Sequence, residues 1–79
     1  MKRRYRLWGR VENLPNGSSR AIAAASPVES GSGPFAEYIR AHMFPEVSES
    51  RIGLAALMYE LSAAIVARGD VVASFDLPR

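Results

Sequence analysis

The chain has 79 residues, of which 48% are hydrophobic, 23% charged and 9% aromatic. A chain this short forms at most one domain and buries only about 60–65% of its unfolded surface, which excludes a multidomain enzyme. It has a net charge of +2 and no cysteine, which excludes disulfide frameworks, thiolate metal sites and cysteine nucleophiles.

The charge is unevenly distributed along the chain. The first ten residues carry five basic side chains and no acid, whereas residues 11–79 carry five arginines and all eight acids, which makes +5 against −3. Such asymmetry points to an acidic partner surface or to nucleic acid. No signal peptide follows the basic start, and no uninterrupted apolar run reaches the roughly 20 residues that span a bilayer. We therefore expect a soluble, cytoplasmic protein without a membrane partner.

Residues 3–14 alternate between two kinds of side chain with period two, which predicts a half-buried strand. The drier face of this strand includes Tyr5 and Leu7 and is expected to face the core. The opposite, basic face consists of Arg4, Arg6, Trp8, Arg10 and Glu12.

Residues 15–18 read Pro-Asn-Gly-Ser and predict a hairpin turn, because asparagine and glycine both tolerate positive φ. A return strand is then expected over residues 19–25. The simplest pairing puts Trp8 opposite Ala25, and a bulge at the turn would shift this register.

In this register Val11 faces Ile22 on the dry side of the hairpin. The small residues of the return strand then lie beside Trp8 and the arginines, where they would leave a shallow trough. These residues are Ala21, Ala23 and Ala25.

Residues 26–34 are rich in serine, glycine and proline, which predicts a mobile loop. A short helix is expected over residues 34–43, because large apolar side chains recur there every four positions. Pro45 would end this helix.

A longer helix should begin near Ser48 or Ser50 as N-cap and end at Gly69, which suits the left-handed position after a helix. One broad apolar face of this helix would pack on the sheet: Leu54, Leu57, Met58, Leu61 and Ile65. A second apolar patch lies nearly opposite: Ile52, Tyr59 and Val66.

A small domain has difficulty covering both sides of such a helix. We therefore expect self-association through Ile52, Tyr59 and Val66, as a homodimer or within a tight protein complex. The alternative is a compact monomer whose second helix face is formed by small residues.

A last strand is expected over residues 70–77, with Val71, Ala73, Phe75 and Leu77 on one face. The order β-β-α-α-β predicts an α+β fold, in which a three-stranded sheet carries one short and one long helix on one face, as a single domain over residues 1–79. The third strand can lie beside the first or the second. Beside the first it would run parallel and bring Asp76 toward the arginines.

Signatures of catalysis are scarce. His42 is the only histidine, and with Glu37 or Glu46 it forms no recognisable catalytic arrangement. We interpret it as a structural cation at the end of the short helix. The carboxylates lack metal-ligand spacing, and no glycine-rich phosphate loop is present. We therefore predict no enzymatic activity, no catalytic residue, no metal and no cofactor.

The basic face is the one group of residues with recognisable chemistry, because Arg4, Arg6 and Arg10 surround Trp8. Such a face can contact a partner protein, bind phosphates while stacking a base, or be only a solvated outer surface.

We favour a non-enzymatic binding module that uses this face. By class-level analogy it is an accessory protein of the phage or mobile-element type, which binds and modulates, or inhibits, a protein or nucleoprotein complex such as a CRISPR-type host-defence effector. One alternative is a nucleic-acid-binding protein or small transcriptional regulator that uses the same face. A second alternative is a structural homo-oligomeric subunit.

Overall fold

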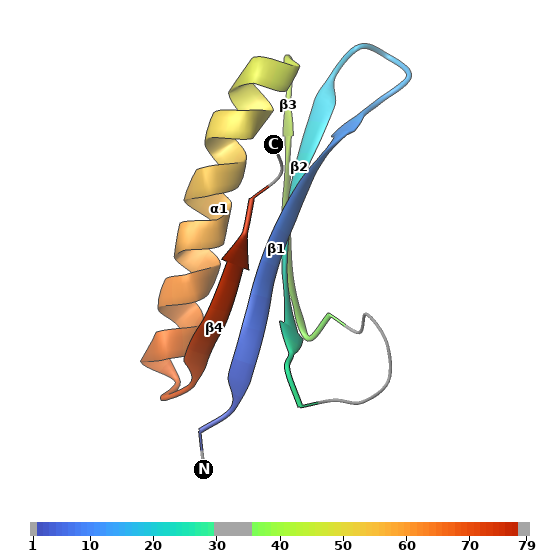
Figure 1. Ribbon diagram of the computed structural model, residues 1–79. Coiled ribbons are helices and arrows are strands. Elements are labelled where there is room, and N and C mark those ends of the chain that lie inside the picture. Colours follow the sequence, from blue (N-terminus) through green and yellow to red (C-terminus); the bar gives the residue numbers. More distant parts are fainter. Residues whose placement is uncertain (1, 30–35, 78–79) are drawn as a thin grey trace.

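The computed structural model describes residues 2–29 and 36–77. Within these ranges the chain forms a mixed four-stranded sheet and one helix that crosses a single face of it, so the predicted α+β class is confirmed (Figure 1). The elements are β1 (Arg4–Asn13), β2 (Ser19–Pro27), β3 (Tyr38–Phe44), α1 (Val47–Ala67) and β4 (Val71–Asp76). The strand order is β3-β2-β1-β4, so β3 and β4 form the edges.

β1 and β2 form an antiparallel hairpin closed by a tight loop at the predicted position. The backbone N–H of Gly17 donates to the carbonyl of Leu14 at 3.0 Å, and Gly17 has a φ of +87°, a left-handed value that glycine adopts without steric cost. Asn16 keeps a negative φ and accepts a hydrogen bond from the backbone N–H of Ser18 at 3.1 Å. The backbone N–H of Leu14 donates to the carbonyl of Ser18 at 2.9 Å, so three residues lie between these paired positions. The predicted pairing of Leu14 with Ser19 leaves four residues, so the observed loop is one residue shorter.

The shorter loop shifts the hairpin register. Each residue of β1 meets the β2 residue one position earlier than predicted: Trp8 pairs with Ala24 instead of Ala25, and Val11 with Ala21 instead of Ile22. A slip of one residue exchanges the two faces of a strand. The alanines predicted beside the basic side chains therefore lie on the helix side of the sheet and are fully buried: Ala21, Ala23 and Ala25.

Residues 38–44 form strand β3, so the short helix predicted over residues 34–43 is wrong in its described part, and residues 34 and 35 lie outside the described residues. β3 pairs antiparallel with β2 from Tyr38 to Phe44. Ile39 and Met43 are four residues apart, a spacing that places them on one face of a strand as well as of a helix. Pairing decides between the two structures, because it satisfies backbone groups of β2 that would otherwise lie at an exposed edge.

The segment predicted as a mobile loop over residues 26–34 is partly strand. Ser26 and Pro27 are the last residues of β2. The backbone N–H of Val28 donates to the carbonyl of Arg4 at 2.9 Å and extends the contact with β1. The loop prediction is wrong at Ser26 and Pro27, whereas Val28 and Glu29 form a turn, and residues 30–34 lie outside the described residues.

Helix α1 packs on the sheet through side chains that recur every three or four residues. This is the spacing of the predicted apolar face. Its buried residues are Ser50, Leu54, Met58, Leu61 and Ile65. They share one core with Tyr5 and Leu7 of β1 and with the buried alanines of β2. The small β2 side chains allow the helix to approach the sheet closely.

The helix begins at Val47, earlier than either predicted N-cap, and Glu46 occupies the cap position without a side-chain hydrogen bond to the helix. Ser50 lies inside the first turn and is fully buried. Its Oγ is 2.8 Å from the Oγ of Ser19 and donates to the carbonyl of Val47 at 2.7 Å. Ser50 therefore ties the helix to β2 instead of capping it.

Gly69 ends the helix as predicted. Its φ is +88°, its N–H donates to the carbonyl of Val66 at 2.9 Å, and the N–H of Asp70 donates to the carbonyl of Ile65 at 3.2 Å. This pair of hydrogen bonds is a common helix C-cap that depends on a left-handed glycine. It turns the chain back toward the sheet, where β4 follows.

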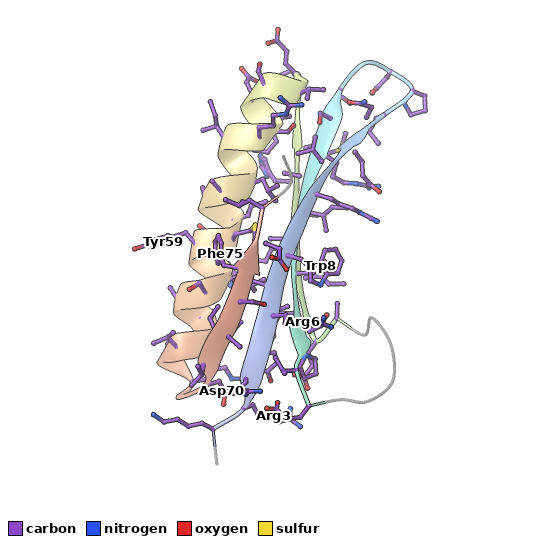
Figure 2. The ribbon with its side chains drawn as sticks, in the orientation of Figure 1. Arg3, Arg6, Trp8, Tyr59, Asp70 and Phe75 are labelled. Carbon is purple, nitrogen blue, oxygen red and sulfur yellow. The ribbon has the colours of Figure 1, made fainter. Side chains whose placement is uncertain are left out.

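β4 lies beside β1 and runs parallel to it, one of the two placements left open by the sequence. The pairing slips by one residue at Ala73, which interrupts the predicted apolar face of this strand. Val71 pairs with Arg4, on the side of the basic residues. Phe75 lies instead on the helix side (Figure 2).

Candidate functional site

The sheet face opposite α1 is covered by no described helix or strand, and the basic side of β1 lies on it. Figure 2 shows Arg6 and Trp8 pointing away from the helix. Because Tyr5 and Leu7 are buried under α1, strand alternation places all four predicted binding residues on this uncovered side. We call it the open face, defined by Arg4, Arg6, Trp8 and Arg10 of β1, Arg20, Ile22 and Ala24 of β2, and Ile39, Ala41 and Met43 of β3.

Trp8 lies at the centre of the open face. Its Nε1–H donates to the Oγ of Ser26 at 3.2 Å, so the indole reaches across to β2. Ser26 and Ala24 are each only 1% exposed although no described helix covers them. The indole side chain shields this part of β2 from water and is itself half-buried.

The sheet register continues this apolar centre toward β3. Trp8, Ala24 and Ile39 occupy one transverse row, and Asp76 of β4 ends the row on the other side of Trp8. The side chain of Ile39 is 65% exposed and that of Met43, on the same strand, 55%. Arginines border the row, so the open face has an apolar centre inside a charged rim.

Carboxylates neutralise much of the basic face. The ion pairs are Arg4 with Glu29 at 2.8 Å, Arg10 with Glu12 at 3.1 Å and Arg20 with Glu12 at 2.7 Å. Hydrogen bonds from Arg20 and Arg4 lower the pKa of Glu12 and of Glu29, respectively, so both stay ionised at neutral pH. Within residues 2–29 and 36–77, Arg6 has no ion-pair partner, and Asp76 pairs with none of the arginines.

A second polar feature is a pocket of about 270 Å³ at the end of the sheet where the chain enters β1. It is lined by Arg3, Tyr5, Glu37, Tyr38, Arg68 and Asp70. Nη1 of Arg3 lies 2.8 Å from Oε1 of Glu37, and Nη1 of Arg68 donates to Oη of Tyr38 at 2.6 Å. Sequence reasoning missed this cluster because its members come from distant segments and follow no local spacing.

The groups around the pocket satisfy one another. A hydrogen bond from the Tyr5 hydroxyl lowers the pKa of Glu37, and the charge of Arg3 lowers it further. The same hydrogen bond, together with burial, raises the pKa of Tyr5. The backbone N–H of Arg3 also donates to Oδ1 of Asp70 at 3.0 Å. The cluster therefore fastens the start of β1 to the segments that precede β3 and β4.

We expect Glu37→Gln to lower stability at neutral pH and to have little effect in acid. The pKa of Glu37 is lower in the folded protein than in the unfolded chain. The ionised carboxylate therefore stabilises the fold fully above its unfolded pKa, and this contribution disappears as the pH falls through its folded pKa.

Urea midpoints of the wild type and the Glu37→Gln variant, measured from neutral pH to below the folded pKa, test this expectation. The two curves should converge in acid. Asp76→Asn is the control, because this exposed carboxylate has no ion pair among the described residues. A wild-type advantage that stays constant across the pH range would contradict the assignment.

The residues predicted for self-association lie on the outward side of α1. Ile52 and Tyr59 are each 76% exposed and Val66 is 59% exposed, and Figure 2 shows Tyr59 pointing away from the sheet. With Ala56 and Ala63 they form an apolar stripe that alternates spacings of four and three residues, the spacing of a coiled-coil seam. Because residues 38–44 form a strand, no short helix covers this stripe within the described residues. Self-association through the stripe stays a prediction.

The same helix is long and apolar enough to cross a bilayer, with a mean hydropathy of 1.3, although the core helix of a soluble protein meets the same criterion. Of its most apolar stretch, 28% is buried inside the protein. The buried part faces the sheet, so the exposed apolar surface of α1 lies on the outward stripe.

His42 lies on β3 and not at a helix end, so the predicted setting of this residue is wrong. It is exposed, and its ring contacts Phe44 edge-on with centroids 4.8 Å apart. Within the described ranges no group of three or more histidine, aspartate or glutamate side chains is placed to hold a metal ion. The absence of enzymatic activity and of a cofactor stays a prediction.

Comparison of the chain with protein-family models, with curated proteins and with solved structures found no match. Inferences about function therefore rest on the geometry of the chain itself.

Proposed function

We propose that this protein is a non-enzymatic binding module that holds a partner protein on the open face of its sheet. The observation that carries the proposal is the uncovered apolar centre formed by Trp8 and Ile39, with arginines around it. An apolar centre within a polar rim is the usual anatomy of a protein interface. Tryptophan and arginine are also the residues most enriched among interface anchors.

The charge of the open face favours a protein over a nucleic acid as partner. Affinity for nucleic acid depends mainly on cations that neutralise phosphates. Arg4 and Arg10 are already paired with carboxylates of the same chain, which leaves Arg6 as the unpaired arginine of the predicted basic face within the described residues. A partner protein gains apolar contact with Trp8 and Ile39 in addition to contact with Arg6.

The role that we propose is that of an accessory protein of the phage or mobile-element type. It would modulate a larger protein or nucleoprotein complex, such as a CRISPR-type host-defence effector, by occupying part of its surface. The small size of the chain and its one uncovered sheet face support a function exerted through binding.

Affinity capture from a nuclease-treated lysate of the native host tests the proposal. The open-face variant combines Arg6→Glu with Trp8→Ala, and the control combines Arg51→Glu with Tyr59→Ala on exposed positions of α1. We expect the wild type and the control to capture a partner that the open-face variant does not. Capture of the same proteins by all three would contradict the proposal, once circular dichroism has shown that all three are folded.

Gel-shift assays with random single- and double-stranded DNA and RNA test the competing function. Phosphate binding weakens steeply with salt, with a log-log slope of about −0.9 per contacted phosphate on duplex DNA. We expect no shift even at low salt. A shift that is lost in Arg6→Glu would instead support a nucleic-acid-binding protein.

A further inference from the structure

β3 is the most exposed strand of the sheet. Of its seven residues, the central five, 39–43, are exposed, and Tyr38 and Phe44 are half-buried. Among the described elements its one strand neighbour is β2, so its other side is a sheet edge. An edge strand presents unpaired N–H and C=O groups that can pair with a further strand.

The β3 edge lacks the features that commonly protect sheet edges. Bulges, proline and outward charges usually prevent edge pairing. The register of β3 with β2 is continuous, whereas β4 is irregular at Ala73. β3 contains no proline, and its one arginine, Arg40, reaches back to α1, where its Nη1 lies 3.6 Å from Oε2 of Glu60.

The side chains of β3 are symmetric by class about Ala41. Moving outward from this centre, two polar residues are followed by two aliphatic or thioether residues and then by two aromatic residues. The three pairs are Arg40 with His42, Ile39 with Met43, and Tyr38 with Phe44. A second copy that pairs antiparallel about Ala41 therefore sets each side chain opposite one of its own class.

We propose that two copies of this chain pair antiparallel through β3, centred on Ala41, and form a continuous eight-stranded sheet from two four-stranded ones. Ile39 then packs against Met43 of the second copy on the open face, and Tyr38 faces Phe44 of the second copy on the helix side. Arg40 faces a histidine, so no two arginines oppose each other. Both helices lie on one side of the joined sheet, and the two open faces become one surface.

The outward stripe of α1 is the other surface that a second copy can cover. Contact through this stripe buries side chains such as Ile52 and Tyr59 but satisfies no backbone group, because the helix has already paired its own. Contact through β3 buries Ile39 and Met43 and also pairs the free N–H and C=O groups of the edge. The strand therefore offers the more complete interface.

Single-cysteine variants distinguish the possible interfaces, because the natural chain contains no cysteine. Ala41→Cys marks the centre of the proposed pairing, Tyr59→Cys the centre of the helix stripe, and Ala73→Cys the other edge strand. All three positions are exposed, so the substitutions leave the core intact. With a short bis-maleimide at micromolar protein, we expect Ala41→Cys to cross-link to twice the chain mass of 8.6 kDa and the other two to stay at the monomer mass.

Cross-linking of Tyr59→Cys in place of Ala41→Cys would put the second copy on the helix and overturn the proposal. Cross-linking of Ala73→Cys in its place would put the second copy on β4, with the same consequence.

Light scattering after size exclusion provides a second measurement. The wild type should have twice the mass of 8.6 kDa, whereas Ala41→Lys should return to 8.6 kDa with an unchanged circular dichroism spectrum, because it opposes two like charges across the axis. Ala73→Lys is the matched control and should remain a dimer. A wild-type mass of 8.6 kDa at micromolar concentration would overturn the proposal without bearing on the binding of a partner to the open face.

Discussion

Replacing Met58 by alanine is expected to destabilise the protein by about 2–5 kcal/mol, the usual effect of removing a large apolar side chain from a closed core. Met58 is fully buried in the middle of the face that α1 turns to the sheet. Its Sδ lies 2.7 Å from the point that a Cβ on Gly9 would occupy, so the side chain fills the space directly above β1. The hydrogen-bonded strand below cannot move into the vacated volume, and a cavity remains.

For a domain of this size, each 1 kcal/mol lowers the melting temperature by about 4–8 °C. We therefore expect Met58→Ala to melt at least about 8 °C below the wild type. Tyr59→Ala is the matched control on the adjacent, 76% exposed position and should stay within about 0.5 kcal/mol. If urea unfolding shows equal losses for both variants, the outer side of α1 is covered in solution, which would also count against pairing through β3.

Gly9→Val is expected to destabilise the fold by about 1–3 kcal/mol, even though valine suits a strand better than glycine does. A Cβ at this position would come within 2.7 Å of Cδ1 of Leu54 and of Sδ of Met58. Both side chains are buried in the core and are at most 1% exposed. The helix would have to shift away from β1. The free energy lost in packing is then larger than the free energy gained from the higher strand propensity of valine.

The double variant Gly9→Val with Met58→Ala separates a steric conflict between these two positions from any change in the strand itself. Valine at position 9 should partly fill the space left by Met58→Ala, so the double variant should lose less free energy of unfolding than the sum of the two single variants. Asn13→Val is the control, because it adds the same side chain at an exposed position of β1. A Gly9→Val protein as stable as the wild type would mean that α1 does not rest on this part of β1.

The predicted binding residues of β1 came together on one face because strand alternation is a local property. Once residues 4–13 are extended, Arg4, Arg6, Trp8 and Arg10 share a side whatever their neighbours are. What lies around them depends on the register with β2, and the shift of one residue changed those neighbours from Ala21, Ala23 and Ala25 to Ile22, Ala24 and Ser26. Glu12, which pairs with Arg10 and Arg20, already belongs to the predicted basic face, whereas Glu29, which pairs with Arg4, comes from a distant segment and could not be assigned from spacing.

The sequence by itself determined the elements whose signals are local. Alternation defined β1, a glycine with positive φ marked the hairpin turn and another the end of α1, and the spacing of Leu54, Met58 and Leu61 identified the buried side of the helix. The tertiary structure alone decided that residues 38–44 are a strand, because a four-residue apolar spacing suits both structures and only the free edge of β2 distinguishes them. It also decided that Arg4 pairs with Glu29 and Arg20 with Glu12, since contacts between separate segments exist only after the chain has folded.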